Sequence, residues 1–451
     1  MDAASVPGTR NARTPLLSDT AARLIHGIDD GDALEELFPL VVEMAKELCN
    51  QQLVPCYNCA AIFENKNHKD HMEIQVLFHS FNRKTLRALV MGTIPYDVPE
   101  INCPNSENLY PAQGAGAYLA SLTIEGREGA FLNCEEIDEV LAILESYRLG
   151  CEAWKVLGDT DAYGDSQLDP QQRDHLTFAL EVDNTYLPED RRYTDRDQPW
   201  APLGVTCGRD GVEAIKELEE QLRRRQSFKS SNPQVIQISS PGYIGCSETI
   251  ASRMPHHDPS SSSMQRSAKI RRVLMSCIRR IGLGVVARSY PILLAWKPSH
   301  IRLVEVLATV LAQSLVSVGG LNVIQPGTSS PPKDSSNPRY DDNKLLVFLD
   351  RPWYGENMEF SMDMRALKTA FEELEQDGDH EPPPEQEIRK LAESNQQLEA
   401  ERKRLLDQLN HALYAGEAEM EGQIRRFHET DHLLLAEKLC DSYNHAVDGE
   451  D

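Results

Sequence analysis

Residues 242–257 read Gly-Tyr-Ile-Gly-Cys-Ser-Glu-Thr-Ile-Ala-Ser-Arg-Met-Pro-His-His, and they combine a predicted strand with several chemically capable side chains. The run 234–246 predicts two short strands around a Ser-Ser-Pro-Gly turn, and Tyr243-Ile244-Gly245 closes the second strand. Arg253 follows Tyr243 by ten residues, and His257 follows Arg253 by four. A tyrosine, an arginine and a histidine therefore succeed one another at short spacing from the end of one strand.

Two further polar residues lie on and after an apolar helix downstream. Residues 299–318 predict a strongly apolar helix with Ser299 as its N-cap, ended by Gly319-Gly320. Glu305 lies in this helix, and Asn322 follows it. Because a carboxylate is costly to bury without a partner, we expect Glu305 to face a cleft. An exposed helix face is the alternative.

Together these residues resemble the GIY-YIG nuclease superfamily, including its phage-derived DNA-binding branch, over residues 232–326, about a fifth of the chain. In that family the second tripeptide, an arginine, a glutamate on a helix and a trailing asparagine recur in this order. The first tripeptide is expected about ten residues before Tyr243, on a strand at 235–238, where the chain has neither its glycine nor its tyrosine. The resemblance implies a small antiparallel sheet flanked by helices.

The resemblance also implies a role for each residue in phosphodiester hydrolysis. Tyr243 would activate or orient the attacking water, and His257 would assist proton transfer. Arg253 would hold the scissile phosphate and offset charge in the transition state. Glu305 would bind one Mg²⁺, which polarises the phosphate and supports the leaving oxygen. Asn322 would fasten the fold, and the implied function is DNA or other nucleic-acid binding, with metal-dependent endonuclease cleavage as its possible activity.

A basic run breaks the overall acidity of the chain, whose formal net charge is −25. From Met264 to Val304 there are nine Lys or Arg residues and no Asp or Glu. Such a surface can neutralise phosphates and supply sequence-independent affinity. The alternative is a basic face that docks against acidic segments of this protein or of a partner. The residues expected to contact nucleic acid are Lys269, Arg271, Arg272, Arg279 and Arg280.

A candidate zinc site lies near the N-terminus, where Cys56-x2-Cys59 precedes His68-x2-His71. Two thiolates and two imidazoles complete a tetrahedral Zn²⁺ shell, and four protein ligands leave no open position, so the site would be structural. The gap between the pairs is shorter than is usual for zinc motifs. The alternative is a reduced, buried cysteine pair with exposed histidines.

The C-terminal tail predicts a coiled coil over residues 385–440. An a/d seam with 3-4-3-4 spacing carries polar residues at two a positions, which fix register and partner number. Its members are Ile388, Leu391, Asn395, Leu398, Arg402, Leu405 and Leu409. We expect self-association as a homodimer, which would make a second nucleic-acid contact intramolecular. The alternative is a single amphipathic helix packed on its own domain.

The whole pattern predicts a multidomain α+β protein. Helices are expected at 33–50, 134–150, 211–226 and 267–281, strands within 284–296 and 345–353, and a strand followed by a helix at 72–93. The expected order is a polar arm (1–18), a mixed helical domain (20–150), an irregular acidic segment (151–210), a helix (211–231), the GIY-YIG-like domain (232–326), a linker (327–343), a short strand/helix segment (344–380) and the coiled coil (385–440).

The composition also predicts the cellular compartment of the protein and leaves open an alternative to nucleic-acid binding. Ten scattered cysteines, no apolar run near 18 residues and no apolar signal segment predict an intracellular protein of nucleus or cytoplasm without a membrane partner. The competing function is a non-enzymatic coiled-coil interaction or scaffold protein with a degenerate domain. Nucleic-acid binding should weaken steeply with salt, whereas an apolar docking interface should barely respond.

Overall fold

The computed structural model describes most of the chain up to residue 376. The described residues are 17–51, 53–54, 57–65, 69–99, 103–157, 168–186, 192, 201–208, 210–227, 229, 233–259, 268–328 and 338–376. The chain divides into two compact units, Met1–Val347 with Arg351–Ser361, and Phe348–Asp350 with Met362–Asp451. The sheet and the helices up to α13 belong to the first unit.

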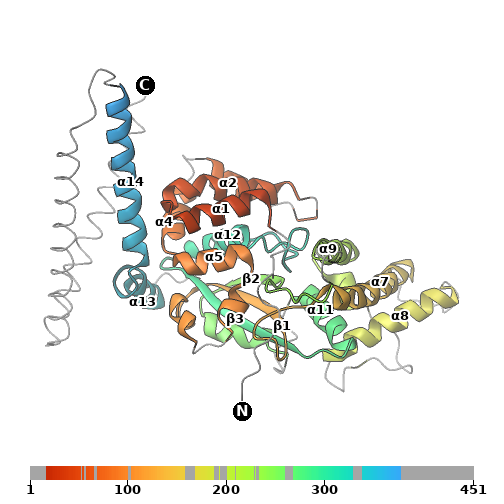
Figure 1. The fold of residues 1–451 in the computed structure, drawn as a ribbon. Helices are drawn as coiled ribbons and strands as arrows, with labels where there is room; N and C mark the ends of the chain where they lie inside the picture. Colours follow the sequence, from red (N-terminus) through yellow and green to blue (C-terminus); the bar gives the residue numbers. More distant parts are fainter. Residues whose placement is uncertain are drawn as a thin grey trace, which may run out of the picture. The chain divides into compact units, whose positions relative to one another are not determined.

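One antiparallel sheet, of three strands in the described part of the chain, lies at the centre of the first unit (Figure 1). Its strands are β1 (Gly116–Ile124), β2 (Gly242–Ser247) and β3 (Val285–Leu294), in the order β2-β1-β3. Every residue of β1 is buried. The middle strand therefore comes from far earlier in the chain than either of its neighbours.

Helices pack against one side of the sheet and beside one of its ends. Figure 1 shows α1, α2, α5 and α12 gathered on one side, while α7, α8, α9 and α11 lie together beside one end of the sheet. Helix α12 contacts β1 and β2 as well as α2 and α4. Leu122 and Ile124, at the end of β1, share a buried core with residues of α7, α9 and α11.

The helices fall into groups before, between and after the first two strands. The N-terminal group is α1 (Asp19–Asp30), α2 (Leu34–Cys49), α3 (Tyr57–Glu64), α4 (Lys69–His79), α5 (Arg83–Met91) and α6 (Ile94–Asp97). Between β1 and β2 lie α7 (Cys134–Leu157), α8 (Pro170–Asp183) and α9 (Gly211–Arg224). After β2 come α10 (Ile250–Arg253), α11 (Lys269–Arg280), α12 (His300–Leu311), α13 (Pro338–Leu345) and α14 (Trp353–Gln376).

Local sequence signals explain several helix ends. Asp169 caps α8 in a capping box with Gln172, with Pro170 in the first turn, where a missing N–H costs nothing. Asp210 accepts a hydrogen bond from the first turn of α9. Gly92 ends α5 in the left-handed conformation, with φ of 68°, which side chains rarely adopt.

The structure confirms part of the sequence prediction. The mixed α+β class and the small antiparallel sheet are present. The helices expected at 134–150, 211–226 and 267–281 correspond to α7, α9 and α11, and the strand expected in 284–296 is β3. The coiled coil predicted at 385–440 and most of the polar arm lie outside the described residues.

Other expectations about the elements are wrong. At 72–93 the expected helix is present as α5, but the strand expected before it is part of helix α4. Residues 345–353 include a π-helical turn (Leu346–Asp350) in place of a strand. Short apolar runs fit a buried helix as well as a strand, so periodicity did not separate them. The segment 151–210, expected to be irregular, contains α8 and the end of α7.

The domain boundaries expected near residues 150 and 232 also do not separate compact units. β1 lies within the expected N-terminal domain, yet it pairs with β2 and β3 from the region 232–326. The two regions therefore share one sheet and one compact unit.

Asn322 fastens the loop after α12 to strand β2 of the sheet. Its Oδ1 accepts a hydrogen bond from Ile244 N at 2.9 Å, and its Nδ2 donates to Ile244 O at 2.8 Å. The side chain is buried, so both backbone groups of Ile244 would otherwise lie unpaired away from water.

We predict that Asn322→Ala lowers the free energy of unfolding by about 2–3 kcal/mol, because it leaves a buried N–H and a buried C=O without partners. Urea denaturation followed by circular dichroism measures this loss. Asn105→Ala is the matched control, since Asn105 is exposed and donates to one carbonyl, that of Asp97. A loss of less than about 0.5 kcal/mol in both variants would contradict the fastening role.

Candidate active site

Two tyrosines from paired strands lie side by side on one face of the sheet. Tyr118 of β1 stands opposite Gly245 of β2, and Tyr243 of β2 stands opposite Ala120. Residues in this diagonal relation on one face are close enough for their rings to interact. A Cβ at Gly245 would lie 2.5 Å from Tyr118 Oη and 3.1 Å from Tyr243 Cε1, so glycine leaves the room that both rings occupy.

His257 completes this aromatic group. Helix α10 ends at Arg253, and a short 3-10 helix (Met254–His257) containing Pro255 continues the chain toward the tyrosines. His257 Nε2 lies 3.0 Å from Tyr118 Oη. The imidazole centroid lies 5.4 Å from that of the Tyr118 ring and 5.5 Å from that of the Tyr243 ring. The histidine therefore touches both strands' tyrosines at once.

Burial sets the protonation states of this group. Desolvation, with nearby Arg271, His256 and Arg253, lowers the pKa of His257 to about 3, so its imidazole is neutral at pH 7. Desolvation, with the negative charge of Glu305, raises the pKa of Tyr243 to about 12. Burial also raises the pKa of Tyr118. Both phenols thus stay protonated at neutral pH.

Arg253 is the exposed member of the site. Its Nη1 lies 3.5 Å from His256 Nδ1, and its side chain faces solvent. Its positive charge acts to lower the pKa values of Tyr118, Tyr243 and His257, so it lies electrostatically close to all three. An exposed guanidinium beside buried hydroxyl groups is suited to holding a phosphate.

Glu305 lies between β2 and the loop that follows Asn322. Its Oε2 accepts a hydrogen bond from Gly327 N at 3.0 Å, and the Cys246 thiol donates a further hydrogen bond to the carboxylate. The residue is partly buried, and desolvation raises its pKa. The carboxylate is therefore held by two segments and is not on an open helix face.

The structure places Tyr243 and His257 in ring contact, and the charges of Arg253 and Glu305 act on the pKa of Tyr243, so these four predicted residues lie in one region of the fold. It also adds Tyr118, which that reasoning missed. The available signal was Gly116-Ala117-Tyr118 at the start of a β-favouring apolar run. The strand beside Tyr243 was expected at 235–238, but β2, which contains Tyr243, pairs with β1 instead.

The basic run behaves differently from its prediction. Arg271 is fully buried, and its Nη1 donates a hydrogen bond to His257 O at 3.0 Å, which helps to fix the backbone of the histidine. Arg272 is buried as well, near Asp183, whose charge acts to raise its pKa. The expectation that these two arginines contact nucleic acid is wrong, because neither reaches the surface.

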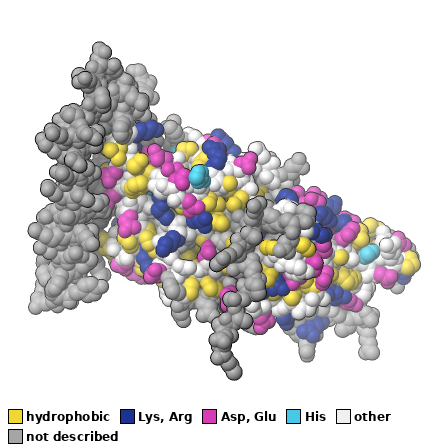
Figure 2. Space-filling model, in the orientation of Figure 1, with side chains coloured by type: hydrophobic (Ala, Val, Ile, Leu, Met, Phe, Trp, Pro, Cys, Tyr) yellow, Lys and Arg dark blue, Asp and Glu magenta, His cyan; other side chains and the backbone are white. Residues whose placement is uncertain are grey.

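The other cations of the run mostly have partners within the protein. Arg280 pairs with Glu181 at 3.1 Å and lies 4.5 Å from the centre of the Phe178 ring, and Lys269 donates to Thr206 Oγ1 at 2.6 Å. Further along, acidic residues of α4 bind Lys297 and Arg302. On the face in Figure 2, basic and acidic side chains are interspersed. This matches the alternative of docking against the protein's own acidic segments.

The predicted zinc ligands fall only partly within the described residues. Cys56 and His68 lie outside them. Cys59 and His71 are buried, and His71 Nδ1 lies 3.2 Å from Ile62 O. Within the described ranges, no group of three or more His, Cys, Asp or Glu residues is placed to hold a metal ion.

The low pKa of His257 makes stability depend on pH. The folded-state pKa of His257 is about 3, which lies below the unfolded value near 6.5. Below pH 6.5, therefore, this imidazole is protonated in the unfolded chain but remains neutral in the folded chain. We predict that stability falls by about 2 kcal/mol from this group between pH 6.5 and pH 5. In His257→Gln, the decrease between pH 7.5 and pH 5 should be smaller by that amount.

Urea titrations of both proteins at the two pH values measure this difference. His26→Gln is the control, because His26 is exposed and pairs with Asp30 at the surface. Equal pH dependence in His257→Gln and in the unaltered chain would contradict the burial argument.

Comparisons with known proteins identify no relative of the chain. A scan against models of protein families, a search of curated proteins and a search of solved structures each found no match. Among the described residues, no helix combines the length and the apolarity needed to span a bilayer. The site is therefore interpreted from its own residues and geometry.

Proposed function

We propose that this protein binds nucleic acid and hydrolyses phosphodiester bonds at the site formed by Tyr118, Tyr243, Arg253, His257 and Glu305. The observation that carries the proposal is the convergence of two tyrosines from adjacent strands on one buried histidine. An exposed arginine and a held carboxylate adjoin this group. Together they supply oriented hydroxyl groups for the attacking water, a phosphate ligand and a metal ligand.

The position of Tyr118 supports the GIY-YIG resemblance. That resemblance calls for a first tripeptide with a glycine and a tyrosine on the strand beside Tyr243-Ile244-Gly245. Gly116-Ala117-Tyr118 has both residues and lies on β1, which pairs with β2. In this reading, the segment 125–241, with α7, α8 and α9, is an insertion between the two tripeptides.

Each side chain of the proposed site has its own role in phosphodiester hydrolysis. The imidazole of His257 stays neutral and orients the hydroxyl of Tyr118 through their 3.0 Å contact. The proton that the attacking water loses passes to a phosphate oxygen or to solvent water. The phenol of Tyr243 keeps its proton and donates a hydrogen bond that orients the water or a phosphate oxygen. The exposed guanidinium of Arg253 pairs with phosphate oxygens and stabilises the charge that develops there.

Glu305 fits the role of a Mg²⁺ ligand. Mg²⁺ commonly uses one or two protein carboxylates together with waters and substrate phosphates, so a single carboxylate suffices. The hydrogen bonds from Gly327 and Cys246 hold Glu305 in place for an ion that the substrate helps to bind. When bound, Mg²⁺ polarises the phosphate and stabilises the leaving oxygen.

The test uses the full chain with labelled duplex DNA, branched DNA and single-stranded RNA, with Mg²⁺ or EDTA, at low and physiological salt. We expect salt-sensitive binding and cleavage that requires Mg²⁺. Glu305→Gln and Arg253→Ala should each lower kcat by about a hundredfold or more, because each removes stabilisation of transition-state charge. Tyr118→Phe should lower the rate, since it removes the hydroxyl that His257 orients toward the substrate.

Matched controls separate the site from the rest of the chain. Glu217 is a partly buried glutamate whose pKa is also raised by burial, but it lies on α9. Glu217→Gln and Arg23→Ala, the latter at an exposed arginine of α1 that pairs with Glu43, should keep full cleavage. Cleavage that survives Glu305→Gln would overturn the proposed site, and binding without any cleavage would reduce the proposal to recognition. Absence of binding at low salt would overturn both parts.

A further inference from the structure

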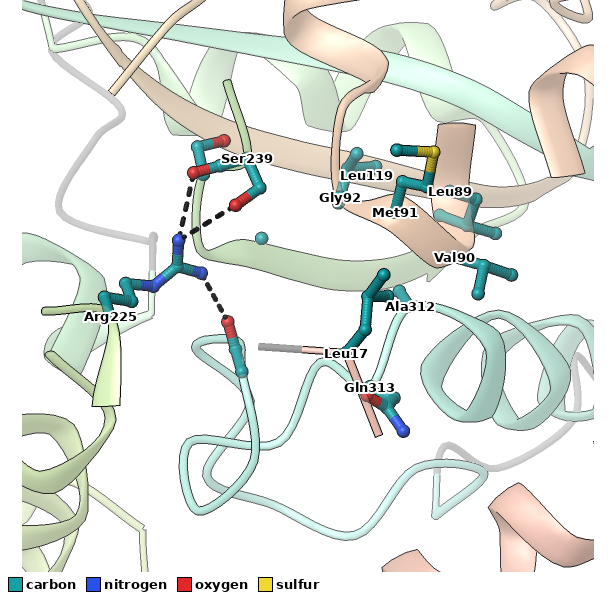
Figure 3. Close-up of a pocket in the computed structure, with 13 residues that line it drawn as sticks. Leu17, Leu89, Val90, Met91, Gly92, Leu119, Arg225, Ser239, Ala312 and Gln313 are labelled. Carbon is teal, nitrogen blue, oxygen red and sulfur yellow. Dashed lines mark hydrogen bonds between the residues drawn. The ribbon is translucent and has the colours of Figure 1, made fainter. Parts of the chain in front are cut away.

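A small cavity of about 40 Å³ lies in the first unit, on the side of the sheet opposite the tyrosines. Successive residues of a strand point to opposite faces, so Leu119 lines this cavity while Tyr118 faces the proposed active site. Figure 3 shows Arg225 and Ser239 on one side of the cavity, and Leu89, Met91 and Leu119 on the other. The cavity thus has one polar wall and one apolar wall.

The polar wall is centred on a buried guanidinium. Only 2% of Arg225 is exposed. Its Nη1 donates to Ser239 O at 3.0 Å and to Ser239 Oγ at 3.3 Å, and its Nη2 donates to Gly319 O at 3.2 Å (Figure 3). These acceptors are carbonyl and hydroxyl oxygens, so they satisfy hydrogen bonds without cancelling the charge.

The described surroundings of Arg225 supply no negative charge. Desolvation and the neighbouring Arg224 lower its pKa to about 9, and no carboxylate counteracts this. It therefore stays protonated at pH 7. The face of Phe131 lies 5.7 Å away and offers partial compensation. A buried cation without a counter-ion is costly, so an anion in the adjoining cavity would be strongly favoured.

A second buried polar group at the same cavity also lacks a partner in the described part of the chain. Ser240 lines the cavity, is 6% exposed, and its hydroxyl has no hydrogen-bond partner there. Arg225 Nε is likewise unpaired among the described residues. Buried hydroxyl groups are nearly always paired, so one that borders a cavity indicates a group bound inside it.

We propose that this cavity is a binding site for a small carboxylate with a short aliphatic tail, of roughly two to four carbons. The carboxylate would pair with Arg225 and accept from Ser240, and the tail would lie against Leu89, Met91 and Leu119. Phosphate fits less well, because its further charged oxygens would face the apolar wall. This site is independent of the proposed nuclease function, since it shares no residue with it.

The test is a thermal-shift and calorimetric titration of the full chain with sodium propionate, against sodium chloride at equal ionic strength. We expect saturable stabilisation by propionate, weaker stabilisation by acetate, and none beyond the chloride effect by phosphate. Arg225→Met should weaken propionate binding at least about tenfold, because the bound carboxylate loses its cationic partner. Arg224→Met is the matched control, since Arg224 is exposed and donates to the carbonyls of Ser317 and Val318.

A second variant covers the case in which Arg225→Met does not fold. Ala312 lines the cavity and is partly exposed, so Ala312→Leu fills the space and leaves the guanidinium intact. It should abolish the propionate response while the protein remains folded. Equal responses to propionate and chloride in the unaltered chain, or an unchanged response in Ala312→Leu, would overturn the proposal. A larger response to phosphate than to propionate would overturn the carboxylate assignment.

Discussion

The pairing of β1 with both β2 and β3 is the constraint on which the rest of the first unit depends. β1 is buried along its whole length, and it has a partner strand on each edge and helices packed against it. The same pairing sets Tyr118 diagonally beside Tyr243 and requires a glycine at residue 245. A one-residue slip in this register would move Tyr118 to the opposite face of the sheet and separate it from Tyr243.

The sequence was most informative where the relevant residues are neighbours. Arg253 and His257 follow Tyr243 within one short stretch, and Glu305 lies in a recognisable apolar helix, so these four members of the candidate site could be named from the sequence. Tyr118 could not, because its closeness to Tyr243 results from a strand pair formed across a long intervening segment. Local propensity contains no information about which distant strand will become a neighbour.

Charge patterns were less informative, because a count of residues does not show which of them reach solvent. The run from Met264 to Val304 resembles a basic surface, yet Arg271 and Arg272 point inward. Arg271 and Arg225 share one structural use, since each donates from a buried position to backbone carbonyls of separate segments. Arginine suits this task because its planar fork offers several donors in fixed directions.

The wide separation of the paired strands also bears on how the chain is synthesised. β1 is complete at residue 124, but its second partner strand ends only at residue 294. At the usual pace of translation, this apolar strand emerges from the ribosome on the order of ten seconds before both its edges can be paired. During that interval its unpaired edges are open to association with other nascent chains. The helices α7, α8 and α9, made in the meantime, can shelter its end through Leu122 and Ile124.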